Sequence, residues 1–437
     1  MAAASFRLLH FSSLFLIILI SLSSNAQRSD GSDSLILPII KDGGSHQYIT
    51  HFHQRTPPVP INLVVDLGGR FLWVDCHSGY VSSTYRPVQC RSIQCSTALA
   101  TKSESSTFPT PGCSKNSCTL FPENTVAGTI SRGELVEDEI TVRSTNGSIS
   151  TADHFLFSCG TTSLLNQLAS GVQGMAGLGR NRIGLPSQLS AIFNLHRKFA
   201  ICLPSSTVSD GVVFFGGGPY MFGPNIDVSK SLIFTPLISK SGTELELISS
   251  DEYYIGVKSI KVNGNRLLLN SALLSVDSKT GSGGTKLSTV VPYTTLESSI
   301  YNALTEVFVS SSKLYNMTRV EPVAPFGFCF RTESIGWNRN GPVVPNINFV
   351  LQSEMVNWRI FGSNLMVPIS DQVMCLGLLD GGLNPKASIV IGGYQLENNL
   401  LEFDLGTSML GFSSSLLNKE TSCSGFNFDP VPRVDSS

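Results

Sequence analysis

The residues of this chain that could do chemistry lie in two stretches of similar type. In the first half, the apolar run Leu63–Val65 leads into Asp66-Leu67-Gly68, and Met175-Ala176-Gly177 follows later in the chain. In the second half, Leu287-Ser288-Thr289 is followed by Val390-Ile391-Gly392 at a similar spacing. Two carboxylates that share one proton can activate water and protonate a carbonyl, whereas one carboxylate cannot do both. The spacing predicts an internal repeat, and only the first stretch contains an acid.

The elements that must position these stretches are mostly strands. Short apolar or alternating runs are bounded by Gly, Pro, Asn and Ser, which is typical of strands. Asn263-Gly264 predicts a tight hairpin, and helical patterns are few. Together these patterns predict an all-β fold with minor helix. The predicted strands are Ile61–Val65, Phe71–Val74, Val212–Phe215, Tyr253–Ile260 and Ile389–Ile391, and the predicted helices are Leu185–Phe193 and Leu296–Ser311.

Composition excludes several classes of protein. The chain has 437 residues, of which 14% are charged and 41% hydrophobic, with 39 Gly and 22 Pro. This balance argues against disorder, coiled coil and collagen, and predicts a turn-rich globular protein. Lys and Arg number 30 against 32 Asp and Glu, and no run of four basic residues occurs. We therefore expect no nucleic-acid partner.

The N-terminus predicts export from the cell. Arg7 is the only charged residue before residue 28, the apolar stretch Leu8–Leu22 follows it, and Ser24-Asn25-Ala26 offers a small-x-small cleavage site. We interpret residues 1–26 as a signal peptide. A membrane anchor is the alternative, but the unbroken apolar run Leu14–Ile20 is far shorter than the ~20 residues that a span needs. We expect a secreted protein with no membrane span.

The cysteine count agrees with secretion. An even number in a secreted chain predicts disulfides, here five, and the sequence alone does not choose their pairing. No paired C-x-x-C spacing with histidines predicts a zinc site, so we expect no metal and no cofactor. Asn146-Gly147-Ser148 and Asn316-Met317-Thr318 are sequons for N-glycosylation. The ten cysteines are Cys76, Cys90, Cys95, Cys113, Cys118, Cys159, Cys202, Cys329, Cys375 and Cys423.

The stretch 66–76 resembles the first active-site stretch of plant pepsin-like aspartic proteases, which have the peptidase A1 fold. In that family Asp-Thr/Ser-Gly follows two hydrophobic residues and precedes Trp-Val-x-Cys. The resemblance covers essentially the whole chain after residue 26 and implies two β-rich lobes, 27–230 and 231–437, with a cleft between them and the boundary near Lys230. Later stretches that match in order are Met175–Arg180, Val212–Gly217, Tyr253–Asn263 and Val390–Phe412.

The resemblance also implies that the proteolytic chemistry is incomplete. Asp66 stands at the first aspartate position, but Leu67 replaces the Thr or Ser whose hydrogen bond holds the family's two active-site loops together. Gly284–Val291 aligns with the second aspartate stretch, where Ser288 occupies the position of the acid. Val290 replaces a glycine, which we expect to prevent the close approach of this loop to its partner. Asp66 alone cannot form the dyad, so we expect no catalytic residue.

A third departure concerns the hairpin that covers the cleft. Active family members carry a Tyr on it, around the stretch Asn124–Asp138, yet no Tyr occurs between Tyr85 and Tyr220. The chain is therefore expected not to be an enzyme. An active aspartic peptidase, which would need a second acid, is the alternative.

Among pepsin-like proteins without catalytic residues, the chain resembles plant extracellular dermal glycoproteins, xyloglucanase inhibitors and the wheat xylanase inhibitors. The resemblance implies a secreted defence glycoprotein of the apoplast or cell wall that inhibits microbial glycoside hydrolases, either a family 12 xyloglucanase or a family 11 xylanase. Close relatives carry twelve cysteines, so one of their bridges is expected to be absent here. A storage or binding protein without an enzyme target fits the same fold and is the second alternative.

Two loops of the second half are the expected contacts with the target. A retaining endoglucanase places two carboxyl groups ~5–5.5 Å apart in an open groove, and the planar fork of an Arg could serve both. Relatives place such groups on a loop that here holds Trp337 and Arg339, and on another that here holds Lys419. Arg331 lies on the first loop, and Glu420 follows Lys419, so the charge on the second loop is mixed. We assign target binding to Arg339, Lys419 and Trp337.

Overall fold

Strands dominate the chain, as the sequence patterns predict. The computed structural model describes residues 34–99, 112–114, 116–238 and 251–428. The expected signal peptide, 1–26, lies outside these residues. The strands of the first half are β1 Leu35–Lys41, β2 Tyr48–Gln54, β3 Val59–Asp66, β4 Trp73–Asp75, β5 Arg86–Pro87, β6 Gly112–Ser114, β7 Ser117–Leu120, β8 Glu123–Asn124, β9 Thr129–Ile130, β10 Gly133–Ser144, β11 Ile149–Gly160, β12 Gly174–Gly177, β13 Lys198–Cys202 and β14 Gly211–Phe215.

The second half continues in short strands. They are β15 Ile233–Ile238, β16 Tyr254–Ile255, β17 Ser259–Val262, β18 Asn265–Arg266, β19 Thr285–Leu287, β20 Thr294–Leu296, β21 Arg319–Val320, β22 Cys329–Arg331, β23 Gly336–Asn338, β24 Gly341–Val343, β25 Ile347–Val350, β26 Asn357–Ile360, β27 Met366–Ser370, β28 Val373–Leu376, β29 Leu378–Asp380, β30 Ile389–Ile391, β31 Leu400–Asp404 and β32 Met409–Phe412.

Helices are few and short, which confirms the all-β prediction. They are α2 Ile93–Leu99, α3 Leu185–Ile192, α4 Ser271–Leu274, α5 Ser298–Ser312 and α6 Gly393–Leu396, with 3₁₀ turns η1 Thr162–Leu165, η2 Val228–Ser231, η3 Lys313–Tyr315, η4 Thr332–Ser334, η5 Gly362–Asn364, η6 Leu416–Lys419 and η7 Cys423–Gly425. Helix α5 begins later than predicted because the Glu297 side chain accepts hydrogen bonds from Ser299 N and Ile300 N and so caps the helix.

One predicted strand is divided in the structure. The run Tyr253–Ile260 forms β16 and β17, which belong to different sheets. β16 pairs with β15 and β19, whereas β17 pairs with β18 and β25. The apolar residues of this run are buried, as predicted, but the pattern could not reveal that the chain changes sheet. The predicted hairpin at Asn263-Gly264 is present between β17 and β18, and both turn residues have positive φ, 49° and 85°.

The predicted repeat appears as a duplicated strand arrangement. In the first half β3 runs parallel to β12, β12 runs antiparallel to β4, and β4 runs parallel to β11. In the second half β19 runs parallel to β30, β30 runs antiparallel to β20, and β20 runs parallel to β29. The first strand of each set ends at one of the two stretches singled out in the sequence.

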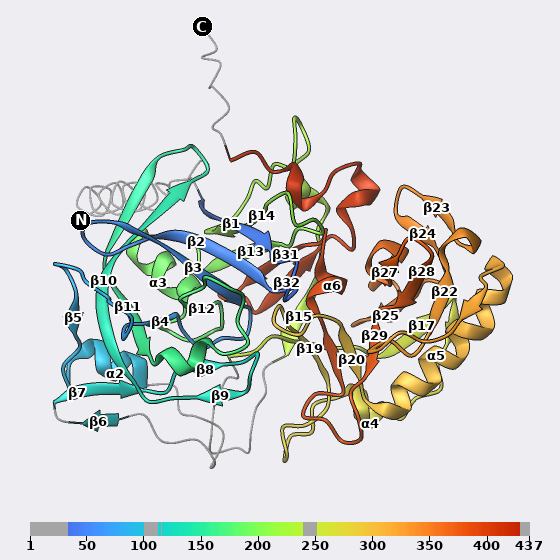
Figure 1. Cartoon of the computed structure of the whole chain (residues 1–437), viewed down its shortest axis with the longest axis horizontal. Coiled ribbons are helices and arrows are strands. Elements are labelled where there is room, and N and C mark those ends of the chain that lie inside the picture. Colours follow the sequence, from blue (N-terminus) through green and yellow to red (C-terminus); the bar gives the residue numbers. More distant parts are fainter. Residues whose placement is uncertain (1–33, 100–111, 115, 239–250, 429–437) are drawn as a thin grey trace, which may run out of the picture. The chain divides into compact units, whose positions relative to one another are not determined.

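Strands from both halves also share one sheet. β13 of the first half pairs with β31 of the second, and β31 pairs with β32, which pairs with β15. Figure 1 shows these strands in the middle, with β2–β5 and β10–β12 on one side and β20–β29 on the other. Stacked aromatic rings support the junction, with the centroids of Phe199 and Phe403 4.8 Å apart. The boundary near Lys230 stays a prediction.

All ten cysteines pair, which confirms the expected five bridges. Cys202–Cys423 joins residues 221 positions apart and ties the C-terminal segment to β13. The other bridges are Cys76–Cys159, Cys90–Cys113, Cys95–Cys118 and Cys329–Cys375.

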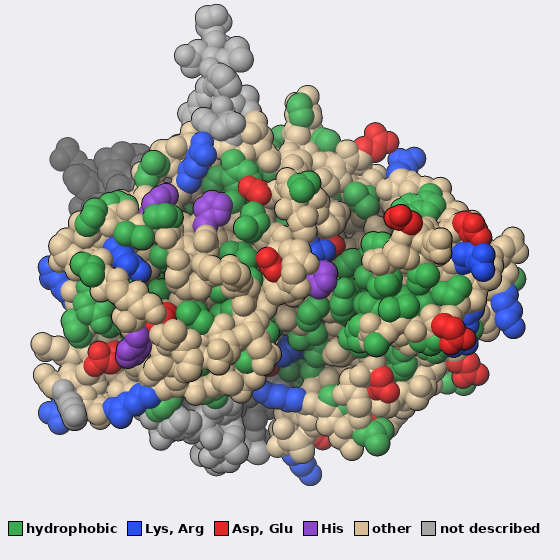
Figure 2. Space-filling view, viewed as in Figure 1, with side chains coloured by type: hydrophobic (Ala, Val, Ile, Leu, Met, Phe, Trp, Pro, Cys, Tyr) green, Lys and Arg blue, Asp and Glu red, His purple; other side chains and the backbone are tan. Residues whose placement is uncertain are grey.

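The surface shown in Figure 2 mixes acidic and basic side chains without a field of one sign. Apolar side chains gather on the same face where Figure 1 labels β28 and β29. Within the described ranges, no helix is long and apolar enough to cross a bilayer.

Candidate functional site

Asp66 lies at the C-terminal end of β3, beside Gly177 of the parallel strand β12. Its side chain is buried, with 4% of the residue exposed. Asp66 Oδ2 accepts a hydrogen bond from Thr125 Oγ1 at 2.6 Å, and Oδ1 accepts one from Gly68 N at 3.0 Å. Burial raises the pKa of this carboxyl, while the bonds from Thr125 and Gly68 act in the opposite direction.

Ser288 occupies the equivalent place in the second half. It follows β19 directly, and extending the β19–β30 register by one residue sets it against Gly392, as Asp66 is set against Gly177. Ser288 is also buried, at 5% exposure, and its Oγ accepts a hydrogen bond from Val291 N at 3.2 Å. The structure thus places a hydroxyl where a symmetric pair would need a second carboxyl.

The two stretches meet through Thr289. Its Oγ1 donates to Val65 O at 2.7 Å and accepts from Leu67 N at 3.0 Å. The expectation that Val290 would keep this loop from its partner is therefore wrong, because one threonine reaches across without help from a glycine. Val290 packs against the apolar cluster around Trp73 instead. Leu67 is fully buried and makes no matching hydroxyl contact from the other side.

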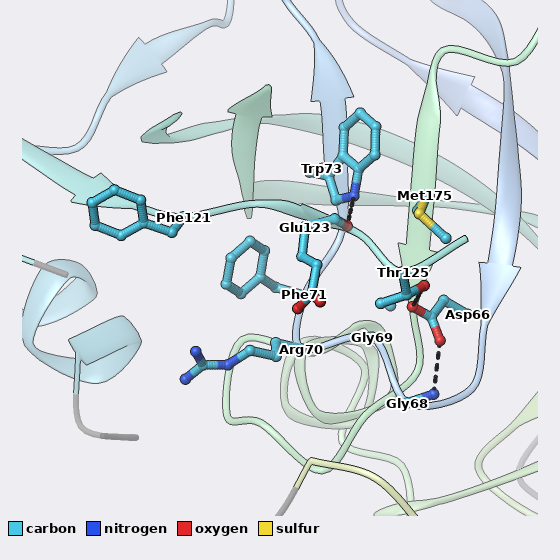
Figure 3. A pocket seen from close by; sticks show the side chains of 11 residues that line it. Asp66, Gly68, Gly69, Arg70, Phe71, Trp73, Phe121, Glu123, Thr125 and Met175 are labelled. Carbon is cyan, nitrogen blue, oxygen red and sulfur yellow. Dashed lines mark hydrogen bonds between the residues drawn. The ribbon is translucent and has the colours of Figure 1, made fainter. Parts of the chain in front are cut away.

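The hairpin β8–β9 closes over Asp66. Thr125, just after β8, donates its hydroxyl to the carboxylate, and Trp73 Nε1 donates to Glu123 O at 2.9 Å (Figure 3). The stretch lacks the Tyr of active family members, as the sequence predicts. The sequence did not single out Thr125, although it lies within the stretch Asn124–Asp138 where active family members carry the Tyr. Its hydroxyl satisfies one oxygen of the remaining acid.

Other charged groups surround Asp66, and they come from separate elements. Burial raises the pKa of the Glu123 carboxyl, and the negative charge of the nearby Asp66 raises this pKa further. Glu252 Oε1 lies 2.6 Å from Lys286 Nζ, so its charge is paired. A Cβ on Gly68 would lie 3.3 Å from Glu252 Cγ, which shows how closely this acid packs against the loop. Lys286 stands two residues before Ser288, but nothing in the sequence indicated its partner.

The cavity beside Asp66 is small. It has a volume of about 30 Å³ and is walled by Phe71, Phe121 and Glu123 on one side and by Thr125 and Asp66 on the other (Figure 3). That volume holds roughly two water molecules. Both oxygens of Asp66 are hydrogen-bonded, and the equivalent position of the second half is a serine and not the second carboxyl that a shared proton requires.

The second candidate site is the surface formed by the predicted target-binding residues. Trp337 and Arg339 lie on the β23–β24 hairpin, and Lys419 ends η6. The structure brings the two loops together, because Arg339 Nη1 lies 3.2 Å from Glu420 Oε1. Both side chains are solvent-exposed, at 65% and 80%. We call Trp337, Arg339, Lys419 and Glu420 the hairpin surface.

Two features of the hairpin surface bear on binding. Trp337 is 61% exposed, which is unusual for so large an apolar side chain. Arg331, which the sequence placed on the same loop, is instead the last residue of β22, and it pairs with Glu333 at 3.1 Å. Sequence reasoning noted the mixed charge at Lys419 and Glu420 but could not foresee that Glu420 holds Arg339.

Both sequons are sterically accessible. Asn146 lies exposed in the turn between β10 and β11, where its Oδ1 accepts from Ser148 N at 2.8 Å. Asn316 is exposed after η3 in the left-handed conformation, with φ 55°. The described residues contain no group of three or more His, Cys, Asp or Glu that could hold a metal.

Two family profiles match the chain. One, described as Xylanase inhibitor N-terminal, matches residues 48–217, and the other, Xylanase inhibitor C-terminal, matches residues 252–414. The chain is 53% identical over 428 residues to Probable aspartic proteinase GIP2 of Nicotiana benthamiana, covering 95% of this chain and 97% of the relative. It is 44% identical to Gamma conglutin 1 of Prunus dulcis, covering 96% of each.

Solved structures lead to the same family. The crystal structure of edgp superposes with a TM-score of 0.84 at 54% identity, covering 90% of this chain and 98% of the other. Basic 7S globulin from soybean superposes with a TM-score of 0.76 at 36% identity, covering 91% and 100%. The chain belongs to the xylanase inhibitor family, with a pepsin-like fold.

Proposed function

We propose that this protein is a secreted inhibitor of microbial glycoside hydrolases, either a xyloglucan-specific endoglucanase or a xylanase, and has no peptidase activity. The observation that carries the proposal is the hairpin surface, where two loops 81 residues apart in sequence meet and present Arg339 and Trp337 to solvent. The family name supports a hydrolase as partner.

The chemistry of the hairpin surface suits a carboxylate-lined groove. A retaining endoglucanase holds its two carboxyl groups ~5–5.5 Å apart, and a guanidinium can donate to both. Arg339 stands on a hairpin, so its backbone is braced by strand pairing on both sides. Trp337 adds an aromatic side chain of the type that dominates interface energetics. Sugar-binding clefts expose such carboxylates at their floor, within reach of a protruding hairpin.

Glu420 competes with the target for the guanidinium of Arg339. In the free protein it pairs with Arg339, and a target carboxylate must replace it. An exposed ion pair is worth about 0.2–1 kcal/mol, whereas a charge-assisted contact that loses water in an interface is worth more. The target therefore wins the competition, and Glu420 lowers the affinity without abolishing it.

Secretion and glycosylation complete the proposal. The apolar N-terminal segment, the five disulfides and the two exposed sequons are all typical of a chain that passes through the secretory pathway. A protein that meets microbial hydrolases must act outside the cell, in the apoplast or cell wall. A defence role follows if the target is a pathogen enzyme.

A second candidate is a storage or binding protein without an enzyme target. The chain is 44% identical over nearly its whole length to a gamma conglutin and 36% identical to a basic 7S globulin. One simple measurement distinguishes the two candidates. It asks whether the purified protein inhibits any glycoside hydrolase at stoichiometric concentration.

The test compares inhibition constants against a family 12 xyloglucanase and a family 11 xylanase. We expect Arg339→Ala to weaken inhibition by at least about tenfold, as truncation of a central interface arginine does. Arg339→Lys should recover part of the loss, and Glu420→Gln should tighten inhibition up to about fivefold. Arg331→Ala, which removes another exposed, ion-paired arginine at the end of β22, is the control and should change little.

Two results would contradict the proposal. Failure of the parent protein to inhibit either enzyme would favour the storage candidate. An Arg339→Ala variant as potent as the parent would show that the inhibitory contact lies outside the hairpin surface.

A further inference from the structure

A polar groove lies behind the hairpin surface, between the β23–β24 hairpin and the end of η6. Its volume is about 440 Å³. Four side-chain amides line it, from Asn338 and Asn340 on the hairpin, Asn346 before β25, and Asn418 on η6. Because Asn338 and Asn340 flank Arg339, the hairpin presents its amides to the groove and its guanidinium to Glu420.

The groove contains one charged side chain, Arg359. Its guanidinium lies over the ring of Phe361, 5.1 Å from the centroid. No carboxylate of the described residues lies within 4.0 Å of it, in contrast to Arg266, Arg331 and Arg339, each of which has an acid partner. The described lining includes no Asp or Glu. The groove is therefore a positively charged site of low charge density, with an aromatic face.

Two of the four amides of the groove have their oxygens engaged. Asn338 Oδ1 accepts from Asn340 N at 2.8 Å, and Asn346 Oδ1 accepts from Asn348 Nδ2 at 3.3 Å. With their oxygens engaged, Asn338 and Asn346 have their Nδ2 groups left to offer. The Tyr315 hydroxyl donates to Asn263 Oδ1, so its proton is also used. Asn340 Oδ1, in contrast, is buried and has no hydrogen-bond partner among the described residues. A ligand that carries acceptor oxygens matches the Nδ2 groups of Asn338 and Asn346, and its hydroxyl groups can donate to an amide oxygen.

The walls of the groove are held in place by close backbone packing. Gly341 has φ 87°, and a Cβ there would lie 2.9 Å from Ser363. A Cβ on Gly362 would lie 1.8 Å from Pro342 O. Ser363 N also donates to Asn340 O at 3.1 Å. The β23–β24 hairpin and η5 are thus in direct contact, and the groove exists before any ligand binds, which reduces the ordering cost of binding.

We propose that this groove binds a short oligosaccharide that carries a carboxylate. Arg359 would hold the carboxylate through its planar fork, and the amide donors of Asn338 and Asn346 would bind ring and hydroxyl oxygens. The ring of Phe361, which lies against the guanidinium, would help to hold Arg359 in place. A polyphosphate would need more cations than the groove offers, and an apolar ligand would leave the amides unpaired. The volume lies within the range of small-ligand sites.

The experiment is a calorimetric titration of the full-length secreted protein. A short oligogalacturonide is the probe, and a neutral cello-oligosaccharide of equal length is the comparison. We expect the oligogalacturonide to bind in preference, with affinity that falls as salt is added. Arg359→Ala should weaken binding by at least about tenfold, as loss of a charge-assisted contact implies, and Asn346→Ala should weaken it less.

Arg266→Ala is the matched control, because Arg266 is exposed on β18 of the same four-stranded sheet but does not line the groove. Its binding should equal that of the parent. Arg359 is itself exposed, and a thermal melt of each variant verifies folding. No binding of oligogalacturonide at millimolar concentration, equal binding of the neutral sugar, or undiminished binding by Arg359→Ala would each overturn the proposal. The assay contains no hydrolase, so its outcome is independent of the inhibitory function.

Discussion

Replacing Thr289 by Val should destabilise the protein markedly, because one hydroxyl joins the two halves of the chain. Thr289 is 2% exposed, and its Oγ1 both donates to Val65 O at 2.7 Å and accepts from Leu67 N at 3.0 Å. Valine keeps nearly the same shape but has neither a donor nor an acceptor. The substitution therefore tests the contact between halves with little change in packing volume.

The expected magnitude follows from the groups left behind. Leu67 N loses its acceptor in a fully buried position, at a cost of about 1–3 kcal/mol, and Val65 O loses one donor, at a cost of about 1 kcal/mol. The sum is about 2–4 kcal/mol of unfolding free energy. Urea denaturation with the disulfides intact would measure it through tryptophan fluorescence, since the buried Trp73 and Trp358 report on the first and second halves respectively.

Thr305→Val is the matched control for this measurement. Thr305 is equally buried, at 2% exposure, but its hydroxyl donates to Tyr301 O at 2.8 Å, a carbonyl that already accepts a bond within helix α5. Its replacement should cost less than about 1 kcal/mol. If Thr289→Val lost no more stability than this control, the bridge between Val65, Leu67 and Thr289 would not support the fold as described.

Three further predictions concern the acid pair and the disulfides. The parent protein and Ser288→Asp should both show no pepstatin-sensitive cleavage of denatured globin at acid pH, because Thr125 and Leu67 still differ from a working site; cleavage by the variant would refute this. The raised pKa of Asp66 means that the folded state binds its proton more tightly, so stability should fall as pH rises from the ordinary value of about 3.9 through the raised one. Asp66→Asn should remove that part of the pH dependence. If the unfolding free energies of the variant and the parent changed with pH in parallel, this prediction would be wrong. Replacing both Cys202 and Cys423 by Ser should cost up to about 5 kcal/mol, given the 221-residue separation; an unchanged melting temperature would show that this bridge is dispensable.

The stretches around Asp66 and Ser288 keep several loop contacts, although Ser288 and Leu67 replace the second acid and the hydroxyl residue of the family pattern. Asp66 still accepts from Gly68 N, and Thr289 still bridges the two loops. The bonds of Thr289 join the two halves, whereas the bond between Asp66 and Gly68 holds the loop of the first half. Thr125 then satisfies the oxygen that faces the cavity. The same stretches that resemble an active site therefore also form a contact between the two halves.

Much of the fold could be predicted from local pattern. Apolar runs bounded by turn residues placed β3, β14 and β30 nearly at their observed bounds. The similar spacing of the Asp66 and Ser288 stretches predicted the duplicated strand arrangement, because a repeated supersecondary unit repeats its sequence pattern. An even cysteine count predicted five bridges but not their partners.

The contacts at both candidate sites depended on the path of the chain. The expectation for Val290 failed because it considered one backbone position, whereas the loop is held by the side chain of Thr289. No sequence pattern indicated that Thr125 would donate to Asp66, or that Glu420 would pair with Arg339 across 81 residues. Side-chain periodicity reports which face of a strand is buried, and it is a local property. The partner of a hydroxyl or a guanidinium depends on which distant segment the topology brings within about 3 Å, and only the tertiary structure decides that.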